Sequence, residues 1–286
     1  MKFSTFFIAL FVPLFLMATA PVDTLNFDAD PYFILTEEAD SAIAHRNWPE
    51  AAARLSDAMA VRPDAPTNLL LRTNLAGVYS CMGHDSLALV QYDMVLDRAP
   101  GMFTTLMGRG RLLVKMGRDV EAYDDFSRAI EIDSLNTEVR FYHGMMALYG
   151  GNRNVADRDF SVLARVAPKA RDTAVALGTL YALTGRERQA VPYLQSLVDD
   201  DPQPEYFAYL AGCYLGLGQL SDAGAVINRG LKVYPEDPEL YYYRAWLNRD
   251  RYHLDDARSD GRRAIQLGAS PVRVAELFAG LEKPQE

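Results

Sequence analysis

The feature that most constrains this chain is an alanine that returns about every 34 residues. The spacings between successive members of this column are 37, 34, 34, 34, 33 and 34 residues, over the set Ala51, Ala88, Ala122, Ala156, Ala190, Ala223 and Ala257. A fixed period in this range is typical of repeat proteins, in which each unit buries its apolar face against its neighbours. The period therefore predicts a stack of seven units.

Three further columns keep step with the alanines. Glycine stands five residues before the alanine in five units, and proline stands twelve residues after it in five units. A small residue stands twelve before it in every unit: Ala39, Ala76, Gly110, Gly144, Gly178, Ala211 and Ala245. Small side chains let two helices approach closely, a left-handed glycine ends a helix, and proline stops the next one. The columns therefore predict two helices in each unit.

The pattern resembles the tetratricopeptide repeat family over about residues 32–270. The fifth unit shows the spacing well, with Leu177, Gly178, Tyr181, Gly185, Ala190, Leu194 and Pro202. The resemblance implies an all-α fold, a right-handed α-α superhelix that forms a solenoid. We place the seven repeats at residues 32–68, 69–102, 103–136, 137–170, 171–203, 204–237 and 238–270.

The residues after the last repeat predict one more helix. Ser270 and Pro271 form a favourable helix start, a serine cap followed by proline at the first helical position. Val274, Leu277, Phe278 and Leu281 then recur on one helical face. We expect residues 271–286 to form a capping helix and tail that cover the apolar face of the seventh repeat.

The first twenty residues differ from the rest of the chain. Lys2 is the only charge before an apolar run from Phe6 to Met17, and Ala18-Thr19-Ala20 ends that run. This order predicts a secretory signal peptide at residues 1–20, followed by a linker at residues 21–31. The run is shorter than the roughly 20 residues of a spanning helix, although an uncleaved anchor is the alternative. We expect an exported protein, periplasmic if bacterial and otherwise secreted, with no integral membrane span after cleavage.

Charge and cysteine content narrow the function further. The net charge is −9, from 29 basic and 38 acidic residues, and no basic run stands out. Nucleic-acid binding is therefore not expected. Cys81 and Cys213 lie four repeats apart, too far for a disulfide, so we expect two unpaired thiols.

No arrangement of residues predicts catalysis or a cofactor. The pair Cys81 and His84 offers two ligands where zinc needs three or four. The run Asp199-Asp200-Asp201 falls at the end of a helix and is better explained as a solvated acidic turn, and His143 falls at a buried position. We predict a non-enzymatic protein with neither a metal site nor a cofactor.

The resemblance implies which side chains face a partner. In this family the first helix of each pair lines the concave side, and the register places there Arg111, Lys115, Phe141, Met145, Tyr149, Tyr209, Tyr242, Trp246 and Arg249. Tyrosine, tryptophan, arginine and methionine are enriched where proteins bind. Aromatic residues at helical spacing also serve a packed core, so packing against neighbouring helices is the alternative for each of them.

These observations predict a scaffold that binds a protein or peptide partner in its concave groove. The alternative is a glycan or small-ligand binding protein that uses the aromatic residues of the same groove. Some family members clamp a C-terminal carboxylate with lysine, arginine and asparagine. Asn74, Arg111 and Lys115 match that clamp, but Leu70 and Thr73 stand where its lysines are expected, so the clamp is not predicted.

Overall fold

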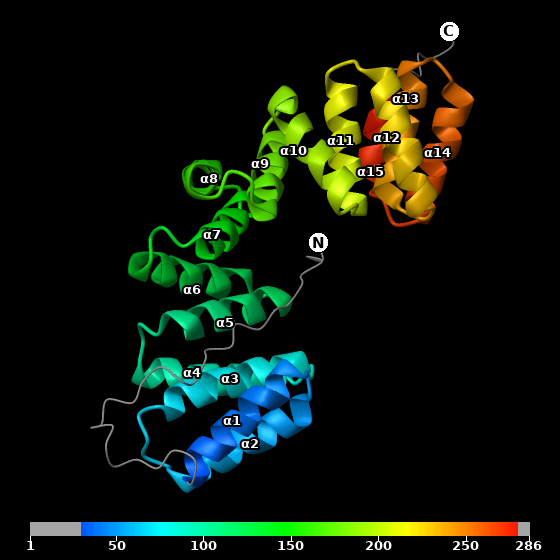
Figure 1. Ribbon diagram of the computed structural model, residues 1–286. Helices are drawn as coiled ribbons and strands as arrows, with labels where there is room; N and C mark the ends of the chain where they lie inside the picture. Colours follow the sequence, from blue (N-terminus) through cyan, green and yellow to red (C-terminus); the bar gives the residue numbers. More distant parts are fainter. Residues whose placement is uncertain (1–29, 280–286) are drawn as a thin grey trace. The chain divides into compact units, whose positions relative to one another are not determined.

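The computed structural model describes residues 30–279, and within that range the chain forms fifteen α-helices and no strand (Figure 1). The helices are α1 (Pro31–Ala44), α2 (Trp48–Val61), α3 (Asn68–Cys81), α4 (Asp85–Arg98), α5 (Phe103–Lys115), α6 (Asp119–Ile132), α7 (Thr137–Tyr149), α8 (Arg153–Val166), α9 (Arg171–Leu183), α10 (Glu187–Asp200), α11 (Pro204–Gly216), α12 (Leu220–Val233), α13 (Pro238–Asp250), α14 (Leu254–Gln266) and α15 (Pro271–Phe278). The predicted all-α class is confirmed.

The chain divides into two compact units between Met146 and Ala147, inside α7. In the first unit, α1 packs on α2, α3 on α4 and α5 on α6, and each pair contacts the next. In the second unit the same holds for the pairs α9 with α10, α11 with α12 and α13 with α14. Each unit is thus a stack of antiparallel helix pairs, as the repeat pattern predicted.

The recurring alanines lie where the two helices of a pair cross. All seven members of the column are fully buried. The small residue on the facing helix leaves space for the large one that follows the alanine: a Cβ atom on Gly110 would lie 2.7 Å from the ring of Phe126. Phe126 and Leu194 are themselves fully buried. Burying one such large apolar side chain contributes about 1.5–3 kcal/mol to the free energy of folding, so the large residues that follow the alanines stabilise the stack.

The turns between paired helices confirm the role of the glycine column. Five glycines there have positive φ angles between 70° and 83°: Gly83, Gly117, Gly151, Gly185 and Gly218. The first and seventh repeats use Arg46 (φ 57°) and Tyr252 (φ 63°) at the same point. A side chain is strained in this left-handed region, so these two turns keep the backbone path without the favoured residue.

Two repeats replace an apolar contact within the pair by a buried ion pair. In the third repeat, Arg109 Nε and Nη2 donate to the two carboxylate oxygens of Asp125 at 2.8 and 2.7 Å. In the seventh, Arg244 donates to both oxygens of Asp260 at 2.9 and 2.6 Å. Asp125 is 1% exposed and Asp260 is 7% exposed. We refer to these two pairs as the Arg–Asp locks.

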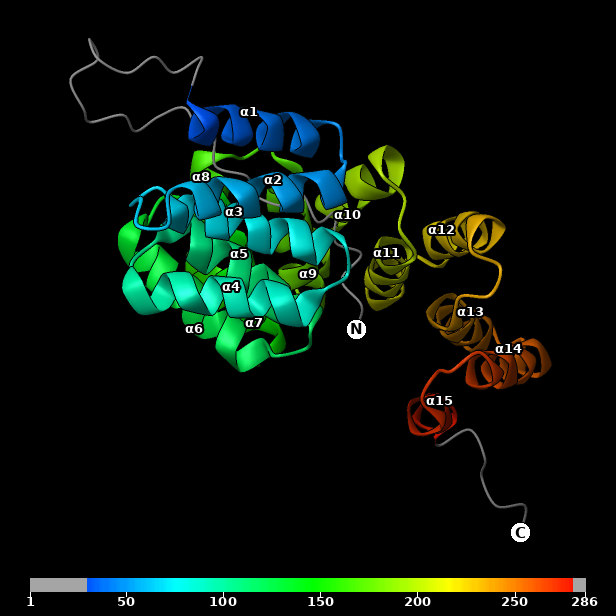
Figure 2. The ribbon, with the colours of Figure 1, turned by 90° about the horizontal axis from the view of Figure 1, so that it is seen from below.

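The helix α15 covers the end of the second unit, beside α13 and α14 (Figure 2). Ser270 caps it by accepting a hydrogen bond from the backbone N–H of Arg273, and Val274 and Leu277 are buried in a cluster with Tyr242 and Ala264. The helix ends at Phe278, and residues 280–286 of the predicted capping segment lie outside the described range.

The predicted signal peptide and residues 21–29 of the predicted linker also lie outside the described range. Between residues 30 and 279, none of the helices combines the length and the apolar character that crossing a bilayer requires.

Candidate functional site

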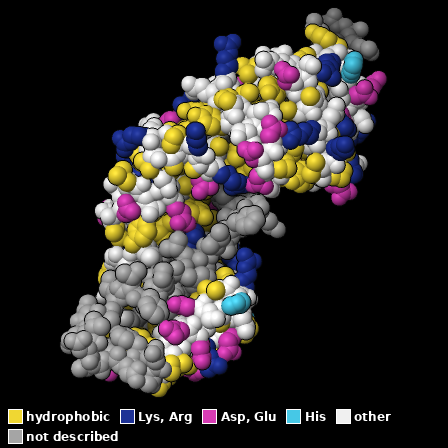
Figure 3. Space-filling model, in the orientation of Figure 1, with side chains coloured by type: hydrophobic (Ala, Val, Ile, Leu, Met, Phe, Trp, Pro, Cys, Tyr) yellow, Lys and Arg dark blue, Asp and Glu magenta, His cyan; other side chains and the backbone are white. Residues whose placement is uncertain are grey.

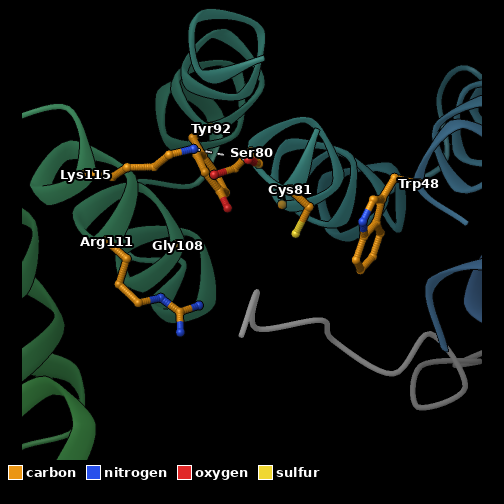
Figure 4. Close-up of a pocket in the computed structure, with 8 residues that line it drawn as sticks. Trp48, Ser80, Cys81, Tyr92, Gly108, Arg111 and Lys115 are labelled. Atoms are coloured by element: carbon orange, nitrogen blue, oxygen red, sulfur yellow. Dashed lines mark hydrogen bonds between the residues drawn. The ribbon is translucent and has the colours of Figure 1, made fainter. Parts of the chain in front are cut away.

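The first unit contains a cavity of ≈ 330 Å³ on the side of its first helices (Figure 4). Arg111 and Lys115 of α5 and Ser80 and Cys81 of α3 come from the last turns of their helices. Trp48 comes from the first turn of α2. The full lining is Trp48, Gly77, Ser80, Cys81, Tyr92, Gly108, Arg111 and Lys115. This volume is at the lower end of the range for ligand pockets, and it suits one side chain or a short segment.

Two glycines make room for the cavity. A Cβ atom on Gly108 would lie 2.6 Å from the hydroxyl oxygen of Tyr92, so only glycine lets that phenol lie across α5. Gly77 supplies bare backbone on α3. Burial raises the pKa of Tyr92, so its hydroxyl stays neutral and is able to donate a hydrogen bond.

Two cations line the cavity and are held in place by acids outside the lining. Arg111 is 8% exposed and its Nη1 donates to Glu138 Oε1 at 2.9 Å. Lys115 Nζ donates to Asp85 Oδ1 at 2.6 Å and to the backbone oxygen of Ser80 at 3.2 Å. The second bond places a cation at the C-terminal end of α3, where the helix dipole favours it. The charged side chains that line the cavity are therefore both basic.

The hydroxyl of Ser80 and the thiol of Cys81, both on α3, show which groups a ligand in the cavity would meet. Ser80 Oγ is buried, and it is the sole buried side-chain oxygen or nitrogen of the described residues that has no hydrogen-bond partner. Burial raises the pKa of the Cys81 thiol, and three cations, Lys115, Arg46 and Arg111, act against that rise. Three cations thus act on the thiol, and a hydroxyl without a hydrogen-bond partner lies beside it.

The fourth repeat offers less exposed surface than the sequence implied. Phe141 is half-buried, with its ring centroid 5.4 Å from that of Tyr142 in an edge-to-face arrangement. Met145 is 2% exposed, so its side chain offers almost no surface to a partner.

In the second unit, Tyr149 and Tyr209 are half-buried on α7 and α11. Burial raises the pKa of both phenols, which therefore stay neutral over the physiological range. The hydroxyl of Tyr209 donates to Glu205 Oε1 at 3.3 Å. These residues form a polar aromatic surface without a described cavity.

The predicted residues of the seventh repeat form one cluster beneath α15. Tyr242 is buried, and the guanidinium carbon of Arg273 lies 3.9 Å from its ring centroid. Trp246 stacks on Tyr243 at 6.2 Å, and Arg249 lies 5.6 Å from the Trp246 ring. Arg249 also donates to the backbone oxygen of Leu277 in α15 at 3.0 Å. This cluster fastens the capping helix to the seventh repeat.

The structure therefore separates residues that the sequence grouped as one groove. Of the nine predicted partner-binding residues, Arg111 and Lys115 line the cavity, while Tyr242, Trp246 and Arg249 support α15. The sequence missed Trp48, Ser80, Cys81 and Tyr92 as cavity residues. The signal for Ser80 and Cys81 was available, because the register that selects Lys115 in the third repeat selects them in the second.

The remaining candidates have structural partners. His143 is buried as predicted: its Nε2 lies 3.2 Å from Ser127 Oγ and its ring stacks on Tyr123 at 4.5 Å. Asp199 accepts a hydrogen bond from Arg229 at 2.6 Å, and Asp201 pairs with Arg171. The part of the chain that the structure describes contains no group of three acidic, histidine or cysteine residues placed to hold a metal ion.

The predicted unpaired thiols are confirmed: both cysteines are free, with Cys213 buried and Cys81 half-buried. Burial raises the pKa of Cys213 to about 12. On the face drawn in Figure 3, basic and acidic side chains are interspersed among apolar ones. The coloured part of that face shows no extended region of one charge.

Comparison with known proteins finds a sequence likeness over part of the second unit. Residues 181–247 match the family model described as "Tetratricopeptide repeat". The mouse FK506-binding protein-like protein is 31% identical over 88 residues, which is 31% of this chain and 25% of that protein. The human protein of the same name is 30% identical over 92 residues, 32% of this chain and 26% of that protein. The match thus spans about a quarter of each of these relatives.

Solved structures extend the likeness over most of the chain. A tetratricopeptide repeat protein from Parabacteroides merdae is 23% identical with a TM-score of 0.62, covering 87% of this chain and 97% of that one. The Cut9-Hcn1 hetero-tetramer of APC/C contains a chain 14% identical with a TM-score of 0.62, covering 90% of this chain and 56% of that one. YrrB, described as "a TPR protein with an unusual peptide-binding site", is 17% identical with a TM-score of 0.51, covering 65% of this chain and 96% of that one.

Proposed function

We propose that this chain, whose helix pairs resemble tetratricopeptide repeats, is an exported, non-enzymatic scaffold that holds a protein partner on the face formed by its first helices. The observation that carries this proposal is the cavity of the first unit, where Arg111, Lys115 and Trp48 surround a buried hydroxyl without a partner. Arginine and tryptophan are the residues that most often carry binding energy at protein interfaces.

The solved relatives support a binding role by analogy. Cut9 is part of an assembly with Hcn1, and YrrB is described as having a peptide-binding site. Both have the same repeat fold, and a stack of helix pairs offers an extended surface along its first helices. The partner of this chain is proposed to be a protein segment on that surface.

A glycan is the less favoured ligand. Sugars stack on open aromatic faces, but the rings of the seventh repeat face arginines: Arg273 lies over Tyr242 and Arg249 over Trp246. In the first unit the cavity carries two cations, which suit an acidic protein segment better than an uncharged sugar.

Site-specific crosslinking tests the binding face. A photoreactive residue replaces Lys115 at the cavity, and in a matched control it replaces Val120, which is 78% exposed on α6, the second helix of the same repeat. We expect a partner that crosslinks in the native cell from position 115 and not from 120. The same set of adducts from both positions would contradict a specific groove.

Export has its own test. The apolar run and the Ala18-Thr19-Ala20 ending support cleavage after Ala20. Mass spectrometry of the chain purified from its native cell should find Pro21 as the first residue. A chain that retains residues 1–20 and fractionates with membranes would support the anchor instead.

A further inference from the structure

The acidic segment between the predicted cleavage site and α1 is a ligand candidate for the cavity of the first unit. Residues 21–29 have the sequence Pro-Val-Asp-Thr-Leu-Asn-Phe-Asp-Ala, with two side-chain carboxylates and no basic side chain. We propose that this segment binds in the cavity lined by Arg111, Lys115 and Trp48 and competes there with the protein partner. The competition rests on the proposed function, whereas the binding of the segment does not.

The segment is long enough to reach the cavity. The hydroxyl of Tyr32 lies 2.5 Å from Thr67 Oγ1 and 3.2 Å from Asn68 Oδ1, so the start of α1 lies beside the start of α3. Ser80 and Cys81 lie at the other end of α3, which has 14 residues and is therefore about 21 Å long. Nine extended residues span about 30 Å.

The charges of segment and cavity are complementary. The basic side chains of the lining, Arg111 and Lys115, come from the same face of α5, four residues apart. Their acidic neighbours Glu138 and Asp85 fix their positions from outside the lining. Lys115, Arg46 and Arg111 all act on the Cys81 thiol, so a carboxylate beside that thiol lies near three cations.

The cavity also fits the uncharged residues of the segment. Its wall carries the indole of Trp48 and the phenol of Tyr92, surfaces on which Leu25 or Phe27 can pack. The buried hydroxyl of Ser80 has a hydrogen bond still to make, and a backbone carbonyl or carboxylate oxygen satisfies it. The two glycines of the lining, Gly77 and Gly108, leave backbone open to an extended strand.

Covalent attachment makes weak binding sufficient. A short tether gives an effective concentration on the order of 1 mM, so an intrinsic Kd of about 100 µM leaves about one cavity in ten open. A free partner must then outcompete the attached segment. A partner would accordingly need about tenfold higher affinity to fill the cavity than it would need if the segment were absent.

The thiol inside the cavity provides the readout. The chain contains two cysteines, Cys81 in the cavity and Cys213 buried in the second unit. Iodoacetamide labelling followed by mass spectrometry measures both rates in one sample, with Cys213 as the internal reference. In the chain that begins at residue 21, we expect deletion of residues 21–29 to increase the Cys81 rate about tenfold.

Matched variants separate docking from other effects. The pair Asp23→Asn and Asp28→Asn should increase the Cys81 rate several-fold, whereas Asp57→Asn with Asp124→Asn, at exposed positions of α2 and α6, should leave it unchanged. A synthetic peptide of residues 21–29 should slow labelling of the deleted chain, and the peptide with both aspartates changed to asparagine should not. An unchanged melting temperature for each variant shows that the first unit stays folded.

Equal Cys81 rates with and without residues 21–29, or the same effect from both peptides, would overturn the proposal. Crosslinking from position 115 distinguishes the two proposals: if it still captures a partner while the Cys81 rates are equal, the segment does not dock but the scaffold function stands. Protection of Cys81 by the segment without any partner at position 115 would leave the docking standing and remove the scaffold function at this site.

Discussion

The third and fifth repeats solve the same packing problem with opposite chemistry. Between the two helices of the third repeat, Arg109 and Asp125 form a buried bidentate ion pair. At the corresponding positions of the fifth repeat stand Leu177, 4% exposed, and Tyr193, half-buried. Both repeats form a packed helix pair, so the repeat tolerates either solution provided that both positions change together. A buried charge is costly only when its partner is missing.

The largest expected effect comes from breaking the third-repeat lock on one side. Asp125→Ala leaves Arg109 with one carboxylate partner, Asp93 at 2.7 Å, and should lower the free energy of unfolding by about 3 kcal/mol, the lower end for breaking a buried pair. Denaturant unfolding followed by circular dichroism measures it. The adjacent Asp124→Ala, at an exposed position, should change stability by less than about 0.5 kcal/mol. Similar losses from the two variants would show that the lock contributes nothing.

Truncating the apolar solution should be of similar or slightly smaller size. Leu177→Ala removes a nearly buried side chain and should cost about 2–5 kcal/mol through lost burial and the cavity that remains. Leu183, on the same helix but 41% exposed, is the control, and Leu183→Ala should cost well under half as much. The comparison between repeats fails if both truncations cost the same.

Exchanging one solution for the other should cost little. The double variant Arg109→Leu with Asp125→Val copies the sixth repeat, where Leu210 and Val226 hold these positions. Replacing a buried ion pair by apolar residues is often neutral or stabilising by about 1–4 kcal/mol. We therefore expect the denaturant midpoint of unfolding of the double variant to lie at or above that of the unaltered chain. A double variant as unstable as Asp125→Ala would mean that the lock specifies the third repeat and is not interchangeable.

The smallest effect concerns ion pairs at the surface of the second unit. Hydrogen bonds from Arg229 and Arg171 lower the pKa of Asp199 and Asp201 from 3.8. A lowered folded pKa adds stability above pH 3.8 that is lost as the pH falls through the folded values. Asp199→Asn with Asp201→Asn should thus reduce the acid dependence of unfolding below pH 3.8, and only slightly because both groups are exposed.

The control for that pH experiment is Asp200→Asn, since the Asp200 carboxylate accepts a hydrogen bond from Ser196 Oγ at 3.1 Å rather than from an arginine. Thermal unfolding between pH 2.5 and 7 records the profiles. If acid lowered the stability of the double variant more steeply than that of the unaltered chain, the two ion pairs would not be the source of the acid dependence.

Sequence periodicity predicted the fold because small residues and glycines are needed at fixed points of every helix pair. The left-handed glycines and the buried alanines lie where the columns placed them. The Arg–Asp locks were harder to predict from the sequence. A single charged residue at a core position is interpreted as a departure from the repeat pattern until its partner is found. Arg109 with Asp125 and Arg244 with Asp260 share a separation of 16 residues, which is the signal that would have paired them.

The candidate site was harder to predict than the fold. The repeat register predicts only which face of the first helix a side chain lies on. It selected Lys115, which lines the cavity, and equally Met145, which is 2% exposed. Whether a side chain on that face is open depends on the neighbours that cover it, as α15 covers Tyr242 and Arg249. Trp48 and Tyr92 come from second helices, which a register for first helices never considers.

The two turns that lack glycine affect how distant relatives of this chain are recognised. A search pattern that rewards glycine there penalises the outermost repeats, although Arg46 and Tyr252 follow the same backbone path as Gly83 and Gly218. Counting repeats by glycine at this turn would give five, whereas the described residues contain seven turns with a positive φ at this position. Scoring the dihedral angle that a position must adopt, instead of the residue that usually adopts it, would recover the full number.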